Sequence, residues 1–362
     1  MNKIFAAPPG DRAFNAPVQT DQLPLPEDGP CLDTVQLARL EQAFRRWADD
    51  TPRRDIRLSR RRILLIFLLI RYTGAKLNEI LQLNPFTDIN DQTVCIRDCE
   101  AEESGARAIV IAEPLGREIE TTLLDPEFRR TLTNGFAVDP AFVRRKFYQR
   151  AEASGFAKHL GGPEMIRRAR AVELVRGNMP LPAVQKLLGH ATPSLTAVHA
   201  SFSEEELRQV TQLFIKRESS RTTSARNSFY GKIIAIERCD VQARITLVNL
   251  GGYQVTSIIT RESLDRLDLR LGQLITAEVK APWIMLQRGP TLTGCSADNR
   301  LRGEIARINR GTVNSECVVR LDDHTELCAL ISTSEREAIG FAAGEQVWAI
   351  FNGFSVILHT DG

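Results

Sequence analysis

The sequence predicts a multidomain protein in which a mainly α-helical N-terminal domain with a small β-hairpin precedes two all-β barrels. The chain of 362 residues is longer than one ordinary domain requires. Apolar residues recur at helical spacing up to residue 220, whereas short runs of β-branched and aromatic residues fill the remainder. That remainder also repeats itself, which is the strongest of the three observations.

The internal repeat has an offset of 72 residues and contains no gap. Residues 224–227 read Ser-Ala-Arg-Asn and return at 296–299 as Ser-Ala-Asp-Asn, and the same offset pairs Gly231 with Gly303. Matching glycines mark turns or close backbone approaches that a side chain would obstruct. The repeat therefore indicates two copies of one small fold.

Each copy is predicted to form a five-stranded barrel of the oligonucleotide/oligosaccharide-binding (OB) type. In the first copy we expect strands at 232–237, 243–248, 253–260 and 274–279 together with 283–286, and a short helix at 261–269. We expect the barrels to span 222–288 and 293–360, the N-terminal domain 34–218, and a mobile proline-rich arm 1–33.

Polar side chains at the strand ends of the first copy form a set of hydrogen-bond donors without a carboxylate. Its members are Ser224, Arg226, Thr260, Ser263 and Lys280. A deprotonated tetrahedral dianion presents only acceptor oxygens, so its site needs such a set. In the second copy, Asp298 and Glu335 replace Arg226 and Ser263, and Asn352 replaces Lys280. Any oxyanion site therefore belongs to the first copy.

The segments 223–227, 259–263 and 280–283 resemble the molybdate-binding Mop domain, and the tandem pair is similar to the C-terminal half of ModE-type regulators. The resemblance implies a homodimer that holds molybdate or tungstate at the subunit interface, with Arg226 reaching across from the other chain. The ligands it implies are Ser224, Ala225, Arg226, Asn227, Thr260, Ser263, Lys280 and Ala281. The oxyanion is a ligand, and no cofactor is expected. The alternative is that these groups are solvated strand ends.

Net charge, cysteine content and the lack of long apolar segments limit which other functions and locations can be expected. The formal net charge is +2, so a nucleic-acid interface must rest on local clusters. The seven cysteines lack paired metal-ligand spacing and indicate free thiols in a reducing cytoplasm, with structural zinc as a minor alternative. No signal peptide is recognisable, and the apolar run 63–70 is too short for a membrane span. We expect a cytoplasmic protein.

The N-terminal domain shows a series of helix signals. Asp33 is expected to cap the first helix, and Ser59 the second. Helices are expected at 33–49, from 59 to 73, and at 77–82, 139–153, 164–176, 182–188 and 203–217, with a β-hairpin at 93–97 and 107–112.

Three segments of this domain, 72–81, 164–168 and 187–196, resemble the catalytic domain of tyrosine recombinases, the phage integrases. That family cleaves DNA with an arginine pair, a hairpin lysine, histidines and a tyrosine nucleophile. Here Lys76 replaces the first arginine, Glu164 the first histidine and His199 the tyrosine, and the hairpin has no lysine. Only Arg167 and His190 remain of that set.

These replacements predict a recombinase-like domain without catalysis. Strand exchange needs a covalent phosphotyrosine, which His199 cannot form. Glu164 would place a carboxylate where negative charge develops. We therefore expect no catalytic residue and no enzyme, although an active recombinase stays the least favoured alternative. A metal site at His190 and His199 is not expected, because no carboxylate or cysteine stands at ligand spacing.

Clusters of arginine favour contacts with DNA phosphates. The residues expected to make these contacts are Arg53, Arg54, Arg57, Arg60, Arg61, Lys76, Arg167, Arg168, Arg170 and His190. The alternative is a solvated surface in which the arginines pair with acids such as Asp55 and Glu173.

An oxyanion-binding half joined to a DNA-handling half predicts a transcriptional regulator. The combination resembles tungstate-responsive regulators of the TunR type, and the resemblance implies control of tungstate or molybdate uptake genes. A storage or buffering protein that binds oxyanion but not DNA is the alternative, against which the long arginine-bearing N-terminal half argues.

Overall fold

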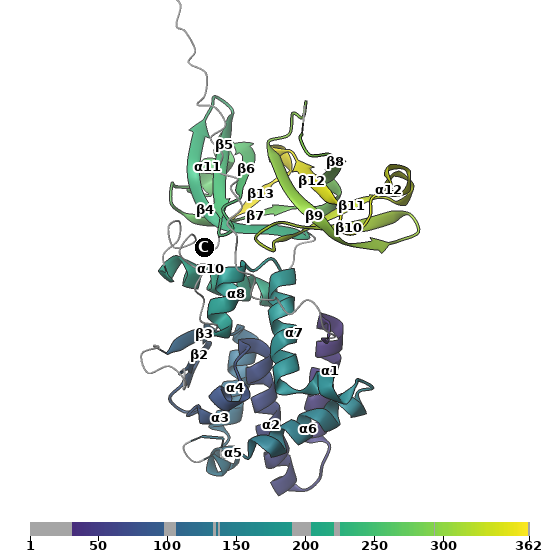
Figure 1. Ribbon diagram of the computed structural model, residues 1–362. Helices are drawn as coiled ribbons and strands as arrows, with labels where there is room; N and C mark the ends of the chain where they lie inside the picture. Colours follow the sequence, from purple (N-terminus) through teal and green to yellow (C-terminus); the bar gives the residue numbers. More distant parts are fainter. Residues whose placement is uncertain are drawn as a thin grey trace, which may run out of the picture.

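The computed structural model describes residues 31–97, 106–132, 135–136, 138–189, 204–220, 225–292 and 294–360. Most of the predicted mobile arm, the tip of the hairpin, and the residues Ser224, His190 and His199 lie outside these ranges. The described residues form a helical unit below two β units that lie side by side (Figure 1). The predicted fold class, a mainly helical N-terminal domain followed by two all-β units, is confirmed.

The helical unit contains ten helices among the described residues and a small antiparallel sheet. The helices are α1 (Thr34–Asp49), α2 (Arg54–Thr73), α3 (Leu77–Gln82), α4 (Glu113–Leu124), α5 (Pro126–Thr131), α6 (Pro140–Ala153), η2 (Lys158–Gly161), α7 (Pro163–Arg176), α8 (Leu181–Leu188) and α10 (Glu204–Ser220). The strands are β1 (Ile89–Asn90), β2 (Thr93–Ile96) and β3 (Arg107–Val110), in the order β1-β2-β3.

Three phenylalanines from different helices hold the helical unit together. The ring of Phe44 in α1 stacks on Phe67 in α2 at 4.1 Å and meets the edge of Phe147 in α6 at 5.2 Å. All three side chains are fully buried, and burial of each stabilises the fold by about 1.5–3 kcal/mol. No described helix combines the length and apolarity that a bilayer crossing requires.

The start of the second helix differs from the prediction. Asp33 caps α1 as expected, accepting a hydrogen bond from Gln36 N at 2.8 Å, but Ser59 lies inside α2 rather than before it. The helix begins at Arg54, and Asp55 in its first turn complements the positive end of the helix dipole. Two helices, α4 and α5, were not predicted; Asp125 caps α5 by accepting from Glu127 N at 2.9 Å.

The β units consist of equivalent elements. The first copy supplies β4 (Asn227–Arg238), β5 (Gln242–Asn249), β6 (Gln254–Thr260), α11 (Arg261–Arg266), β7 (Leu274–Val279), η3 (Ala281–Trp283) and β8 (Met285–Arg288). The second supplies β9 (Asn299–Arg310), β10 (Asn314–Arg320), β11 (Glu326–Ser332), α12 (Thr333–Ile339), β12 (Gln346–Phe351), η4 (Gly353–Ser355) and β13 (Ile357–His359).

The two copies exchange their last strands. The sheet orders are β13-β7-β4-β5-β6 and β11-β10-β9-β12-β8, so β8 of the first copy completes the second sheet and β13 completes the first. The expectation that 283–286 completes its own barrel was therefore wrong. Equivalent strands fit either sheet, and the turn at η3 carries the chain onto the other copy, where η3 packs against β11.

The repeated glycines are explained by close backbone approach. A Cβ atom on Gly231 would lie 2.4 Å from the carbonyl oxygen of Val248, and one on Gly303 would lie 2.5 Å from that of Arg320. Both distances are shorter than any contact a side chain tolerates. The inference of close approach drawn from these glycines is confirmed in both copies.

Reciprocal asparagines join the two copies. The Asn227 amide donates to the Cys328 carbonyl at 2.9 Å and accepts from the Cys328 N–H at 2.6 Å. At the equivalent positions, the Asn299 amide donates to the Thr256 carbonyl at 2.9 Å and accepts from its N–H at 2.7 Å. Each asparagine thus continues the backbone hydrogen bonding of the other copy.

The helical unit contacts both β copies. The Phe214 ring of α10 packs on Tyr230 of β4 at 5.6 Å, and Glu206 pairs with Lys232 at 2.5 Å. The side-chain oxygen of Asn178, between α7 and α8, accepts a hydrogen bond from Glu326 N of β11 at 3.3 Å. The tandem β units are therefore attached to the helical unit through each copy.

Candidate functional site

Two predicted cations meet at one end of the first sheet. Arg226 precedes β4 and Lys280 follows β7, and the antiparallel register pairs Asn227 with Val279. Arg226 and Lys280 therefore occupy the next, adjoining positions. Both side chains are exposed, whereas Ala225 and Ala281 beside them are buried. The fold thus concentrates positive charge at a point that solvent can reach.

Two predicted hydroxyls form a second group at the start of α11. Thr260 Oγ1 accepts from Ser263 N at 3.1 Å and donates to Ser263 Oγ at 2.9 Å. The Ser263 hydroxyl can still donate outward, because its own hydrogen is not used in this pair. Among the described residues, no hydrogen bond joins this hydroxyl group to Arg226 or Lys280. One chain therefore presents the two groups separately.

Asn227, predicted as an oxyanion ligand, is placed differently. Its side chain is fully buried, and both ends of its amide are engaged with Cys328. Contact with a ligand would break these bonds between the copies. In this structure the side chain of Asn227 is therefore occupied in joining the two copies.

The second copy carries carboxylates at the equivalent positions. Asp298, which replaces Arg226, accepts from Gly353 N at 2.9 Å and lies 3.7 Å from Arg244. Asn352, which replaces Lys280, accepts from Phe354 N at 3.1 Å through its side chain. Glu335 stands where Ser263 stands in the first copy. The two carboxylates of this arrangement repel an oxyanion.

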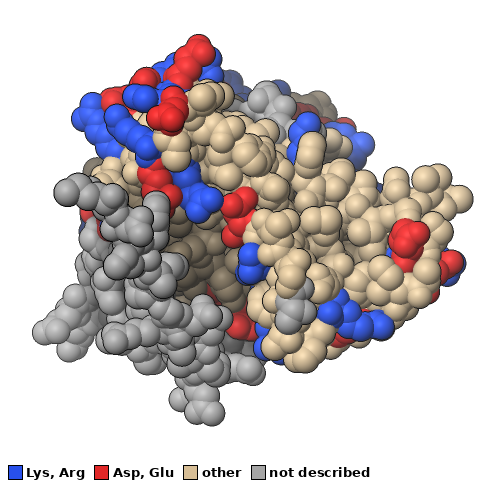
Figure 2. Space-filling view, turned by 90° about the horizontal axis from the view of Figure 1, so that it is seen from above, with Lys and Arg blue, Asp and Glu red and all other residues tan. Residues whose placement is uncertain are grey.

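Large apolar side chains are exposed on the exchanged segments. Trp283 and Met285 belong to η3 and β8, and Phe354 and Ile357 to η4 and β13; their exposed fractions lie between 49% and 61%. Figure 2 looks down on the β units and shows charged side chains gathered toward the rim of a broad area that carries few of them. A contiguous exposed apolar patch is typical of a surface that another molecule covers.

In the helical unit, the retained Arg167 acts as a clamp. Its Nε donates to the Gly74 carbonyl at 2.8 Å and its Nη2 to the Leu188 carbonyl at 2.8 Å. Its Nη1 lies 3.7 Å from Glu164, and the side chain is only 13% exposed. Arg167 therefore ties the end of α2 to the end of α8, with two of its five N–H groups committed to backbone carbonyls and its side chain largely buried.

An ion pair not foreseen from the sequence lies close by. Arg107 of β3 forms a bidentate pair with Glu79 of α3, at 3.0 and 2.7 Å. Glu79 also accepts from Lys76 N at 2.6 Å. A Cβ on Gly189 would collide with the Arg107 guanidinium, so this pair fills the space beside the predicted recombinase-like residues.

The arginine cluster at the start of α2 is largely paired. Arg53 bonds Asp55 at 3.0 Å, Arg54 pairs with Glu127, and Arg61 lies 3.5 Å from Asp49. Arg60 donates to the backbone carbonyls of Trp47 and Asp50 at 2.8 and 2.7 Å. These contacts match the alternative of a solvated, internally neutralised surface, and Asp55 is the partner that alternative named.

Arg170 is also paired, and it is buried. It is 1% exposed and bonds Glu173 at 2.8 Å, while Arg71 makes a bidentate pair with the same carboxylate at 2.6 and 2.8 Å. The prediction of a phosphate contact by Arg170 is therefore wrong, because its guanidinium cannot reach the surface. Burial alone would raise the pKa of Glu173, but the hydrogen bonds and charges of Arg71 and Arg170 lower it.

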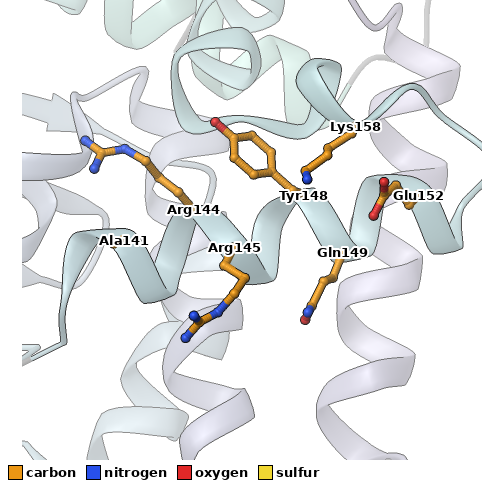
Figure 3. A pocket seen from close by; sticks show the side chains of 7 residues that line it. All are labelled: Ala141, Arg144, Arg145, Tyr148, Gln149, Glu152 and Lys158. Carbon is orange, nitrogen blue, oxygen red and sulfur yellow. The ribbon is translucent and has the colours of Figure 1, made fainter.

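A basic surface that the sequence analysis overlooked lies on α6 and η2. Arg144, Arg145, Tyr148 and Lys158 line a pocket of about 480 Å³ together with Ala141, Gln149 and Glu152. Figure 3 shows Lys158 extending toward Tyr148, while Arg144 and Arg145 project from α6. Of the described acids, none forms an ion pair with these three cations.

Further cations lie elsewhere on α6 and on the neighbouring α2. Burial, followed by the charges of Arg145, Arg150 and Arg60, lowers the pKa of Lys146. Arg60 and Arg150 flank the Trp47 ring, each 5.0 Å from its centroid. Cations interleaved with aromatic rings suit a phosphate backbone. The run Arg144-Arg145-Lys146 was the available signal in the sequence.

Among the described residues, no group of three or more His, Cys, Asp or Glu side chains could hold a metal ion.

The C-terminal part belongs to a known class of domain. Residues 223–286 and 295–358 both match the TOBE domain, so this part of the chain is a tandem pair of TOBE domains. It is similar to the transcriptional regulator ModE of Yersinia pestis, with 39% identity over 142 residues, which are 39% of this chain and 54% of that protein. The chain spans about half the length of the curated relatives it matches.

Two solved structures resemble different halves of the chain. The molybdate-bound, cytoplasmic molybdate-binding protein ModG is 31% identical, with a TM-score of 0.38, and the match covers 39% of this chain and 99% of that one. The XerA recombinase is 17% identical with a TM-score of 0.36, and the match covers 51% of this chain and 65% of that one.

Proposed function

We propose that this protein is an oxyanion-responsive transcriptional regulator of the TunR type. Its tandem TOBE domains bind molybdate or tungstate, its helical domain binds DNA, and it controls tungstate or molybdate uptake genes in the cytoplasm. The observation that carries the proposal is the exposed Arg226–Lys280 pair in a domain pair similar to that of ModE.

The oxyanion site is completed by two subunits. One chain holds the cations Arg226 and Lys280 apart from the Thr260–Ser263 hydroxyls, and a homodimer supplies the missing half of each site. The exposed Trp283, Met285, Phe354 and Ile357 give the second subunit apolar surface to cover. Two cations then neutralise a dianion, and hydroxyl and backbone N–H groups satisfy its remaining oxygens.

The helical domain binds DNA without cutting it. Arg167 is held by two carbonyls and by Glu164, and Lys76 replaces the arginine of the recombinase pattern. A nucleophilic tyrosine is absent from the position of His199 in the sequence. We propose that its phosphate-binding surface lies on α6 and η2 rather than at the start of α2, supported by the cations that line the α6–η2 pocket and by the ion pair of Arg53 with Asp55.

An oxyanion bound across two subunits fixes their relative orientation, and with it the spacing of the two DNA-binding surfaces. A ligand shifts such an equilibrium only by binding one arrangement better than the other. The second subunit's contribution to the site gives the ligand that preference.

A gel-shift titration tests the regulator. Duplex DNA from the promoter region of the uptake genes is bound in the presence of tungstate or molybdate, with sodium chloride at matched ionic strength as control. We expect the oxyanion to change the apparent Kd by about 5- to 150-fold, the usual range of allosteric coupling. Binding that no oxyanion alters would overturn the sensor, and nicked product would establish a recombinase.

A second candidate, an oxyanion storage protein, rests on the similarity to ModG. It predicts oxyanion binding with no specific shift of promoter DNA in the same titration. The cations that line the α6–η2 pocket favour the regulator over it, because such a cluster suits contacts with DNA phosphates.

The DNA surface has its own test. Arg144→Gln with Arg145→Gln should weaken DNA binding by about tenfold or more and make the dependence of log Kd on log salt shallower by about two. The matched control is Arg53→Gln with Arg54→Gln, whose side chains are paired with Asp55 and Glu127. Equal losses in the two double variants would remove the α6–η2 surface as the preferred contact.

A further inference from the structure

Arg226 does not stand alone in the chain. Its Nη1 forms an ion pair with Glu316 Oε1 at 3.3 Å, with Arg226 70% exposed and Glu316 25%. Glu316 lies on β10 of the second TOBE copy, whereas Arg226 belongs to the first. The cation assigned to the oxyanion is therefore already associated with an acceptor from the neighbouring copy.

Glu316 is held firmly as a carboxylate. Its Oε2 accepts from Asn309 Nδ2 at 2.7 Å and its Oε1 from Cys328 Sγ at 3.0 Å. These hydrogen bonds, the one from Asn309 first, lower its pKa below the ordinary value in spite of partial burial. The side chain therefore presents a negative charge to Arg226 at neutral pH.

The same contact exists at the equivalent place with its charges reversed. The position of Glu316 corresponds to Arg244 in the first copy, and Arg226 corresponds to Asp298 in the second. Asp298 lies 3.7 Å from Arg244. The residue after the Ser-Ala dipeptide of each copy thus faces the second strand of the other copy, and the contact is a property of the repeat rather than of one flexible arginine.

An oxyanion must use the guanidinium that Glu316 also uses. Both are oxygen acceptors, and Glu316 takes Nη1 of the Arg226 fork and places a negative charge beside the position a dianion would occupy. When Glu316 is absent, the Arg226 guanidinium is solvated and available to the oxyanion. When Glu316 is present, the oxyanion binds only after the weak ion pair between Arg226 and Glu316 has been broken.

We infer that Glu316 is an internal counterion that competes with the oxyanion for Arg226 and so sets the concentration at which the site fills. The inference rests on the proposed oxyanion function. It makes Glu316, which acts through Arg226, a determinant of the sensor's threshold.

Calorimetric titration of sodium tungstate into the full-length Glu316→Gln variant tests the inference. The pair is partly exposed and therefore weak, so we expect tungstate to bind about two- to fivefold more tightly than to the wild type. Glu316→Ala should change the affinity in the same direction. The matched control, Glu345→Gln, breaks the ion pair with Arg288 elsewhere in the second copy and should leave the affinity unchanged.

A double-mutant cycle separates competition from a general effect of charge. In an Arg226→Ala background, Glu316→Gln should no longer tighten binding, because the shared cation is absent. Unchanged or weaker binding by Glu316→Gln in the wild-type background would overturn the inference. A wild-type protein that releases no heat with tungstate would instead overturn the proposed function.

Discussion

Lys280→Ala is expected to weaken tungstate and molybdate binding by about 10- to 100-fold, the loss of one charge-assisted hydrogen bond. Lys280 follows the last residue of β7 and adjoins Arg226 at the end of the ladder. Its side chain is exposed, so the substitution should leave the fold intact. Isothermal titration calorimetry measures the affinity, and circular dichroism verifies the fold.

Arg270→Ala is the control for charge. Arg270 is an exposed cation of the same copy that pairs with Asp268 in a turn, so its loss should leave the affinity near the wild-type value. Equal affinities for Lys280→Ala and the wild type would show that the oxyanion lies elsewhere.

Glu173→Gln is expected to destabilise the helical domain by about 3–5 kcal/mol. Glu173 carries the only carboxylate bonded to both Arg71 and Arg170 among the described residues, and Arg170 is 1% exposed. Without that charge, the two buried guanidinium groups lose the carboxylate that they share. Urea denaturation at neutral pH measures the loss of the free energy of unfolding.

The same carboxylate gives a dependence of stability on pH. The pKa of Glu173 is lower in the folded protein than its ordinary value, so the charged form stabilises the fold above about pH 4.3 and this contribution disappears as the pH falls further. In Glu173→Gln this part of the acid sensitivity should vanish. Glu205→Gln, which loses an exposed pair with Arg208, is the control and should behave as the wild type in both measurements.

The order of elements could be predicted well, because capping residues and repeated glycines act locally. Asp33 caps α1, and Gly231 and Gly303 lie against carbonyl oxygens. The exchange of β8 and β13 could not be predicted, because equivalent strands have equivalent patterns and either sheet accepts either strand. The number of strands can be predicted from the sequence. The sheet that β8 or β13 joins depends instead on the geometry of the η3 and η4 turns.

The site was predictable only in part for a similar reason. Sequence spacing brought Arg226 and Lys280 into one hypothesis, and the β4–β7 register brings them together in space. Ion pairs between residues of different helices could not be predicted from the sequence. Arg54 forms an ion pair with Glu127, and Arg170 is buried with Glu173 and Arg71. A run of arginines indicates phosphate binding only when the acids that fold against it are known, and this is why the α6–η2 surface was overlooked.

Because of the exchanged strands, neither TOBE copy has a complete sheet without the other. Unfolding of the first copy would remove β8 from the second sheet. Unfolding of the second copy would likewise remove β13 from the first sheet. The proposed ligand cations lie on the first copy, while the hydrogen bond to Asn178 of the helical domain comes from β11 of the second. A displacement at the cation end of the first sheet would therefore also move strands of the second, and the helical unit contacts both copies.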